Sequence, residues 1–165
     1  MTPGAILQRM RDRFGAAVVD THEHCGDATA VVDRATLVEA LRFCRDAREL
    51  AFDMLMDLTA VDYQRYPGRE DGPRFDVVYH LYSLGHNHRL RVKVRVDEDD
   101  ATVPTATDLW PIANWLEREV WDMFGIRFEG HPDLRRLLMY EEFVGHPLRK
   151  DYPINRRQPL IGPRH

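Results

Sequence analysis

The chain has 165 residues, of which 44% are hydrophobic and 30% are charged, and its formal net charge at pH 7 is −4. This length is typical of a single domain, and this composition excludes general disorder. The net negative charge is also unlike the basic footprint of a general nucleic-acid binder, so we expect no nucleic-acid partner.

The expected helices and strands are delimited by Pro and Gly residues and by helix-capping side chains. Pro3 is at a tolerated first-turn position, and Gly15 and Gly125 each end a helix. In chain order, the sequence predicts a helix over 2–14, strands over 17–22 and 28–32, a helix over 35–48, strands over 54–61, 75–82 and 89–96, and a helix from 107 or 108 to 124.

The strand signal is clearest over 75–82 and 89–96, where apolar and polar residues alternate. This pattern is typical of an antiparallel hairpin with one face in a core. The polar face of the second strand is basic and carries Arg89, Arg91, Lys93 and Arg95. Such a face could bind phosphates, but the acidic run over 97–100 and the net charge of the chain favour a solvated strand face.

Residues 130–165 differ in character from the chain before them. Pro residues recur at short intervals and exclude long helices and central strands. The range 131–165 contains seven Lys or Arg and four acidic side chains, a net charge of +3, so the rest of the chain carries −7. Because this segment is rich in Leu, Tyr, Phe and Pro but has no periodicity, we expect it to become ordered by lying along another surface.

These elements together predict an α+β core domain over 1–129 and an extended, Pro-rich docking tail over 130–165. The core is expected to have two layers, with helices packed on one side of a mixed, largely antiparallel sheet. The longest apolar runs have four residues, whereas a spanning helix needs about 20, so we expect no membrane span. The N-terminal residues are charged where a signal peptide would be apolar, so we expect no export.

Metal and redox chemistry have little support in the sequence. Cys25 and Cys44 are far apart in the chain, without a C-x-x-C pattern, which fits reduced thiols in a cytosolic chain. Two such cysteines alone cannot hold an iron–sulfur cluster or a structural zinc ion. In the run 22–25, strand alternation separates His22 and His24 from Glu23 and Cys25, so we interpret the run as a polar strand end.

The predicted helix ending at Phe124 has apolar residues on two sides and carboxylates among them. Glu119 follows Ile112 at heptad spacing, so it falls inside an apolar stripe that includes Trp115, Leu116 and Met123. We therefore expect Glu119 to be buried, since it shares this stripe. Glu117 falls on a second face, with Trp121 and Phe124.

These carboxylates favour ion pairs over catalysis. Glu117 and Glu119 point about 200° apart on a helix, so they cannot act on one substrate as an acid/base pair. A buried carboxylate needs a cationic partner or other compensation. The expected partners are the cations of the tail, Arg135, Arg136 and Arg149.

The run from Glu117 to Leu138, EREVWDMFGIRFEGHPDLRRLL, resembles the signature of one protein family. The run from Glu142 to Pro153 and the predicted strand region from Phe52 to Tyr63 are similar to the tail and the central strand of the same family. That family is the C subunit, also called the thirty-kilodalton subunit, of the proton-pumping NADH–quinone oxidoreductase, respiratory complex I.

The resemblance implies a non-catalytic structural subunit of the hydrophilic arm, peripheral on the cytoplasmic side of the bacterial inner membrane. NADH, FMN, the iron–sulfur clusters and quinone would be bound by other subunits, and this chain would hold no cofactor or metal. Its partners would be the homologues of the D subunit (the forty-nine-kilodalton subunit) and of the B subunit, with the tail running over the former. The complex would transfer electrons from NADH to quinone and translocate protons.

The partner interface implied by the resemblance is made of signature residues. They are Glu117, Arg118, Glu119, Trp121, Asp122, Phe124, Gly125, His131, Pro132, Arg135, Arg136, His146, Pro147, Arg149, Asp151 and Tyr152. The resemblance implies no catalytic, cofactor-binding or metal-binding residue in this chain.

Two alternatives stay open at this point. One is the equivalent subunit of an energy-converting hydrogenase or a related membrane dehydrogenase, which neighbouring genes for quinone- and cluster-binding subunits would distinguish. The other is a free-standing acid/base or metal-dependent enzyme that uses Glu117, Glu119, His131 and His146. Turnover by the purified chain alone would favour that enzyme.

Overall fold

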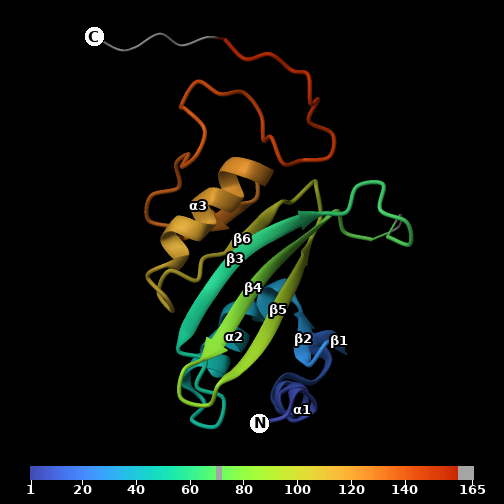
Figure 1. The fold of residues 1–165 in the computed structure, drawn as a ribbon, viewed down its shortest axis with the longest axis vertical. Helices are drawn as coiled ribbons and strands as arrows, with labels where there is room; N and C mark the ends of the chain where they lie inside the picture. The colour runs from blue at the N-terminus through green and yellow to red at the C-terminus, as the bar shows by residue number, and fades with distance from the viewer. Residues whose placement is uncertain (70–71, 160–165) are drawn as a thin grey trace.

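A computed structural model describes residues 1–69 and 72–159 of the chain, so the last six residues of the predicted tail and two residues of the 66–73 loop lie outside the described residues (Figure 1). The helices are α1 (Pro3–Phe14), α2 (Leu37–Asp46) and α3 (Ala113–Phe124), with short 3-10 turns at Gly15–Ala17 and Arg34–Thr36. The strands are β1 (Val18–His24), β2 (Asp27–Val32), β3 (Met54–Asp62), β4 (Phe75–Ser83), β5 (His88–Val96), β6 (Thr102–Pro104) and β7 (Arg127–Glu129).

Among the described residues, the main sheet has the strand order β1-β2-β5-β4-β3. Its neighbours pair antiparallel except β2 and β5, which run parallel. Figure 1 shows α3 beside β3 and α1 beside β1 and β2. With helices on one side of the sheet, the predicted α+β class with a mixed, largely antiparallel sheet is confirmed. The short parallel pair β6–β7 was not expected from the sequence.

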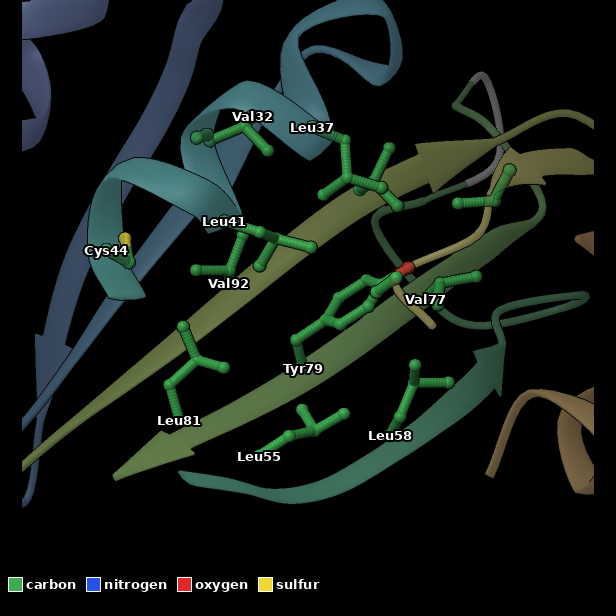
Figure 2. Close-up of a cluster of buried hydrophobic side chains, with 14 of the residues drawn as sticks. Val32, Leu37, Leu41, Cys44, Leu55, Leu58, Val77, Tyr79, Leu81 and Val92 are labelled. Atoms are coloured by element: carbon green, nitrogen blue, oxygen red, sulfur yellow. The ribbon is translucent and has the colours of Figure 1, made fainter. Parts of the chain in front are cut away.

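The core lies between the sheet and the helices (Figure 2). Tyr79 of β4 pairs with Val92 of β5 and with Leu58 of β3, and all three side chains are buried. Figure 2 shows the Tyr79 ring among aliphatic side chains of the sheet, with Leu41 of α2 above the same layer. Alternation along β4 and β5 places these residues on the core face, because successive side chains point to opposite sides.

The opposite face of β5 carries the basic residues, and other strands of the sheet supply their polar and acidic partners. Lys93 lies 3.7 Å from Asp76 on β4, and Arg95 lies 3.5 Å from Asp20 on β1. Arg91 donates a 3.1 Å hydrogen bond to Thr29 on β2. The solvated face expected from the sequence is found at Arg89 and Arg95, which are exposed, whereas Arg91 and Lys93 are half-buried. Cross-strand charge pairs stabilise such a face.

The start of α3 differs from the prediction. The sequence predicts a helix from residue 107, but residues 107–112 form turns and α3 begins at Ala113. Pro111 explains the difference, because a proline disfavours helical geometry in the residue before it and lacks a backbone donor. The predicted end is correct: Gly125 has φ +80°, and its N–H donates a 2.9 Å hydrogen bond to the Trp121 carbonyl.

Candidate partner-docking region

The core side of α3 differs in part from the expected apolar stripe, since Met123 of that stripe is buried but other members are not. Ala113, Glu117 and Val120 face the core, and the Glu117 side chain is fully buried. Trp115 is 54% exposed, and Glu119 is also exposed, so the prediction that Glu119 lies on a buried stripe is wrong. The large aromatic residue suggested the core side, but the small Ala113 side chain lies on the side packed against β3.

Glu117 is satisfied by hydrogen bonds instead of the expected arginine. The Thr105 hydroxyl donates to one carboxylate oxygen at 2.6 Å, and the Ala106 N–H donates to the other at 2.7 Å. Burial raises the pKa of Glu117 to about 7, although both hydrogen bonds oppose the shift. Glu117 therefore ties the 105–107 turn to α3.

Asp122 binds the beginning of the tail. Its Oδ1 atom accepts a 2.6 Å hydrogen bond from the Arg136 guanidinium. Its Oδ2 atom accepts the backbone N–H groups of Leu137, Leu138 and Met139 at 3.0, 2.8 and 2.8 Å. Burial alone would raise the pKa of Asp122, but the Met139 N–H, the Arg136 guanidinium and the other two amides outweigh it and lower the pKa.

Two arginines complete the attachment of this segment to α3. Arg118 donates to the backbone carbonyls of Arg135 and Arg136, each at 3.1 Å, and its guanidinium lies 4.9 Å from the Trp115 ring centroid. Arg136 also donates to the carbonyls of Phe143 and Gly145 at 2.8 and 3.1 Å. Arg118, Asp122 and Arg136 thus act inside the chain and shape the segment 135–145.

Arg135 differs from its neighbour, because its side chain is 70% exposed and pairs with Asp133 at 2.8 Å. The adjacent Pro132 is exposed as well. Arg135 is therefore available at the surface, unlike Arg136.

The signature histidines bind backbone carbonyls of α3. The His131 Nε2 atom lies 3.0 Å from the Asn114 carbonyl, and the His146 Nδ1 atom lies 3.0 Å from the Asp122 carbonyl. A Cβ on Gly125 would approach the His146 ring to 2.7 Å, so the glycine permits this close contact. The histidines therefore hold the tail against the helix.

The structure does not bring together the four residues proposed for a free-standing enzyme, Glu117, Glu119, His131 and His146. Glu117 is buried beneath α3, Glu119 is exposed on its other side, and the two histidines are engaged with the α3 backbone. Within the part of the chain that the structure describes, no group of three or more His, Cys, Asp or Glu side chains is placed to hold a metal ion.

A second attachment holds the tail further along. Arg149 pairs with Asp151 at 3.2 Å and also with Glu98 after β5. Asp151 pairs with Arg74 at 2.8 Å. Sequence reasoning missed Arg74, because its carboxylate partners are 12, 24 and 77 residues away, and no local spacing reveals such contacts.

Large apolar side chains are exposed on the attached tail. They are Leu138, Tyr140, Val144, Leu148 and Ile154. Tyr152 is half-buried and stacks on Phe143 with 6.0 Å between ring centroids, and Pro147 is also half-buried. An exposed apolar set with polar surroundings is typical of a protein–protein contact. We call these five exposed residues the apolar tail set.

The structure thus defines a class: an α+β domain whose polar signature residues hold an irregular tail that displays apolar side chains. Residues 30–158 match the family described as "Respiratory-chain NADH dehydrogenase, 30 Kd subunit". The chain therefore belongs to this family, as its resemblance indicated.

Individual relatives agree. The chain is 46% identical over 156 residues to the C subunit of NADH-quinone oxidoreductase from Geobacter metallireducens, and the match covers 93% of each protein. It is 47% identical over 150 residues to the Acidithiobacillus ferrooxidans protein of that name, covering 90% of this chain and 74% of the relative. It is 50% identical over 144 residues to the Burkholderia mallei protein, covering 86% and 72%.

Two solved structures are similar. One is "Nqo5 of the trypsin-resistant fragment (1-134)", with a TM-score of 0.69 and 38% identity, covering 81% of this chain and 100% of that one. The other is a chain of the membrane-bound sulfane sulfur reductase, an archaeal respiratory membrane complex, with a TM-score of 0.73 and 27% identity, covering 92% and 86%.

These relatives confirm the interpretation of the chain as a complex I subunit. The chain is a subunit of the multisubunit, membrane-associated NADH–quinone oxidoreductase, and the alternative of a hydrogenase subunit is not supported. Among the described residues, no helix combines the length and apolar character needed to cross a bilayer.

Proposed function

We propose that this chain is a non-catalytic scaffold of the hydrophilic arm, on the cytoplasmic side of the bacterial inner membrane. It holds no FMN, iron–sulfur cluster, quinone or metal, and it binds the homologues of the D and B subunits. One observation carries the proposal: Arg118, Asp122 and Arg136 are bound inside the chain, whereas the apolar tail set is exposed.

The tail is the proposed partner surface. Buried apolar anchors contribute much of the binding energy in protein interfaces, whereas rim charges contribute little. The similar Nqo5 structure is described as a trypsin-resistant fragment of residues 1–134. A protease-resistant body of that length supports a division of this chain into a core and a tail that needs a partner for full protection.

The absence of cofactors is proposed from the chemistry of the side chains. Cys25 is exposed and Cys44 is buried, and burial raises the pKa of the Cys44 thiol to about 12. A thiol that stays protonated is a poor metal ligand, because metals bind the thiolate. Two cysteines in such different environments do not supply the ligands of an iron–sulfur cluster.

The test is chemical cross-linking of the intact complex followed by mass spectrometry, together with absorbance spectra of the purified full-length chain. We expect cross-links from Lys150, which is exposed on the tail, to the homologues of the D or B subunits, and a colourless chain that does not oxidise NADH. Stoichiometric flavin or iron in the purified chain, or cross-links from Lys150 to other subunits alone, would contradict the proposal.

A further inference from the structure

Arg74 is a buried cation at the edge of the core, immediately before β4. Its side chain is only 7% exposed. On the core side, its Nε and Nη2 atoms donate to the two oxygens of Asp62, at the end of β3, at 3.0 and 2.7 Å. Its Nη1 atom donates to Glu98, after β5, at 2.6 Å. Arg74 therefore joins the ends of three neighbouring strands.

The same guanidinium binds the tail. Its Nη1 and Nη2 atoms donate to the two oxygens of Asp151 at 3.0 and 2.8 Å. Beside this contact, the Lys150 N–H donates to Asp62 at 2.8 Å. Hydrogen bonds from Arg74 hold the pKa of Asp151 well below its usual range, so this carboxylate is ionised at neutral pH.

Only an arginine suits this position. Arg74 makes paired hydrogen bonds to two carboxylates at once, which requires the planar guanidinium with its five N–H donors. A lysine ammonium is a compact charge and does not reproduce two paired contacts. The site is therefore specific for shape as well as for charge.

The contact between Arg74 and Asp151 lies near one end of the exposed part of the tail. Asp122 holds the tail at 136–139, and Arg74 holds it at 150–151, so the segment between them is fixed at both ends. Tyr140, Val144 and Leu148 lie within that segment and are exposed. Between these ends, Arg136 binds the Phe143 and Gly145 carbonyls and His146 binds the Asp122 carbonyl. The contact with Arg74 adds the fixed far end, so it contributes to which side of the segment faces outward.

We propose that Arg74 is a positioning residue for assembly: by binding Asp151 it fixes the far end of the segment 136–151, so that the apolar side chains face the neighbouring subunit of the complex. This proposal rests on the proposed function, because it assumes that the tail is the partner surface. Arg74 itself is too buried to be a main contact of that partner.

The test measures how tightly full-length variants rejoin membranes that contain the complex without this subunit, scored as rebuilt complex on native gels. We expect Asp151→Asn, Arg74→Gln and Arg74→Lys each to raise the half-saturating concentration about 10- to 100-fold, the range for loss of charged hydrogen bonds. Arg95→Gln is the matched control, because it removes a single pair with Asp20 at the surface. We expect no change for this control.

A double-mutant cycle separates positioning from core stability, since Arg74→Gln also removes the cationic partner of Asp62. Once Arg74 is Gln, adding Asp151→Asn should weaken rebuilding much less than it does in the wild type, because only the pair with Arg149 is then left to lose. If the affinity losses of Arg74→Gln and Asp151→Asn are fully additive, or if both single variants bind like the wild type, the positioning role of Arg74 is overturned. The proposed function would stand in either case. If the wild-type chain also fails to rejoin the membranes, the proposed function fails and this proposal with it.

Discussion

At the scale of single residues, Glu117 links burial to pH. Its pKa is about 7 in the folded chain against an ordinary value of 4.5. Between these values the unfolded chain has released the proton and the folded chain still holds it, so stability falls as pH rises through this window. At about 1.4 kcal/mol per pKa unit, the loss above pH 7 is on the order of 3 kcal/mol.

We expect Glu117→Gln to be more stable than the wild type above pH 7 and similar to it near pH 4.5. The amide can accept from Ala106 N–H and donate to Thr105, so the contacts survive without the ionisation cost. Urea unfolding at several pH values measures the difference between the two chains. Glu119→Gln, at an exposed site of the same helix, is the control. A difference that does not change with pH would contradict this explanation.

Gly125 combines a left-handed backbone with a close contact. We expect Gly125→Ala to cost about 2–4 kcal/mol of stability, because φ is +80° and the new Cβ would meet the His146 ring at 2.7 Å. Gly26→Ala is a matched control, since Gly26 has φ +84° but open space around it. Its cost should be about 1 kcal/mol. Equal losses in denaturation experiments would show that the His146 contact contributes nothing.

At the scale of elements, sequence patterns predicted those helices and strands whose formation depends on residues close together in the chain. The β4–β5 hairpin, the alternation of burial along β5 and the stop at Gly125 were correct, because each depends on neighbouring residues, whereas the first five residues of β4 are buried without alternation. The parallel β2–β5 pair and the short β6–β7 pair join segments far apart in sequence, which no periodicity reveals. The faces of α3 were misassigned because Trp115 suggested burial, whereas Ala113 and Glu117 occupy the core side.

The sequence identified the residues of the candidate site, but it did not predict what each of them binds. The signature pointed to Arg118, Asp122 and Arg136, and the structure shows that they bind the tail of their own chain. The resemblance implied contacts with a neighbouring subunit, which stay a prediction. Arg74 had no sequence signal, since a buried ion network depends on the finished fold.

The observed burial along α3 makes a direct prediction, because Met123 and Trp115 were expected on the same stripe. Met123 is buried, so Met123→Ala should cost about 2–4 kcal/mol of unfolding free energy. Trp115→Ala, on the exposed side, should cost under about 1 kcal/mol, including loss of its contact with Arg118. Urea unfolding of the full-length variants measures both. A larger loss for Trp115→Ala than for Met123→Ala would contradict the assignment of the faces.

The two attachments of the tail predict an order of trypsin cleavage in the purified chain. Arg135 and Arg156 are exposed, and cleavage after them should be fast. Arg136 and Arg149 are engaged with Asp122 and Glu98, so cleavage there should be slower. In the assembled complex all four sites should be protected. Time-resolved mass spectrometry gives the order, and early cleavage at Arg149 would show that the second attachment does not hold in the free chain.

At the scale of the whole molecule, charge is distributed so that the tail binds its own core. The tail carries a positive net charge and the rest of the chain a negative one, and Arg136 and Arg149 contact acidic groups of the body. Arg135, Lys150 and Arg156 stay exposed on the tail beside the apolar tail set. Exposed charges at the rim of an interface contribute little to affinity, whereas buried apolar anchors contribute much. A partner of the tail would therefore gain binding energy mainly from apolar burial.

The central claim is that this chain supports assembly and takes no part in the chemistry. The most direct test replaces Leu138 and Val144, both exposed on the tail, with Asp, and compares assembled complex on native gels with NADH–quinone activity per assembled complex. Leu84→Asp, in the exposed β4–β5 turn, is the control. The predicted result is about tenfold less assembled complex with unchanged activity per complex. Full assembly with slow turnover would contradict the claim.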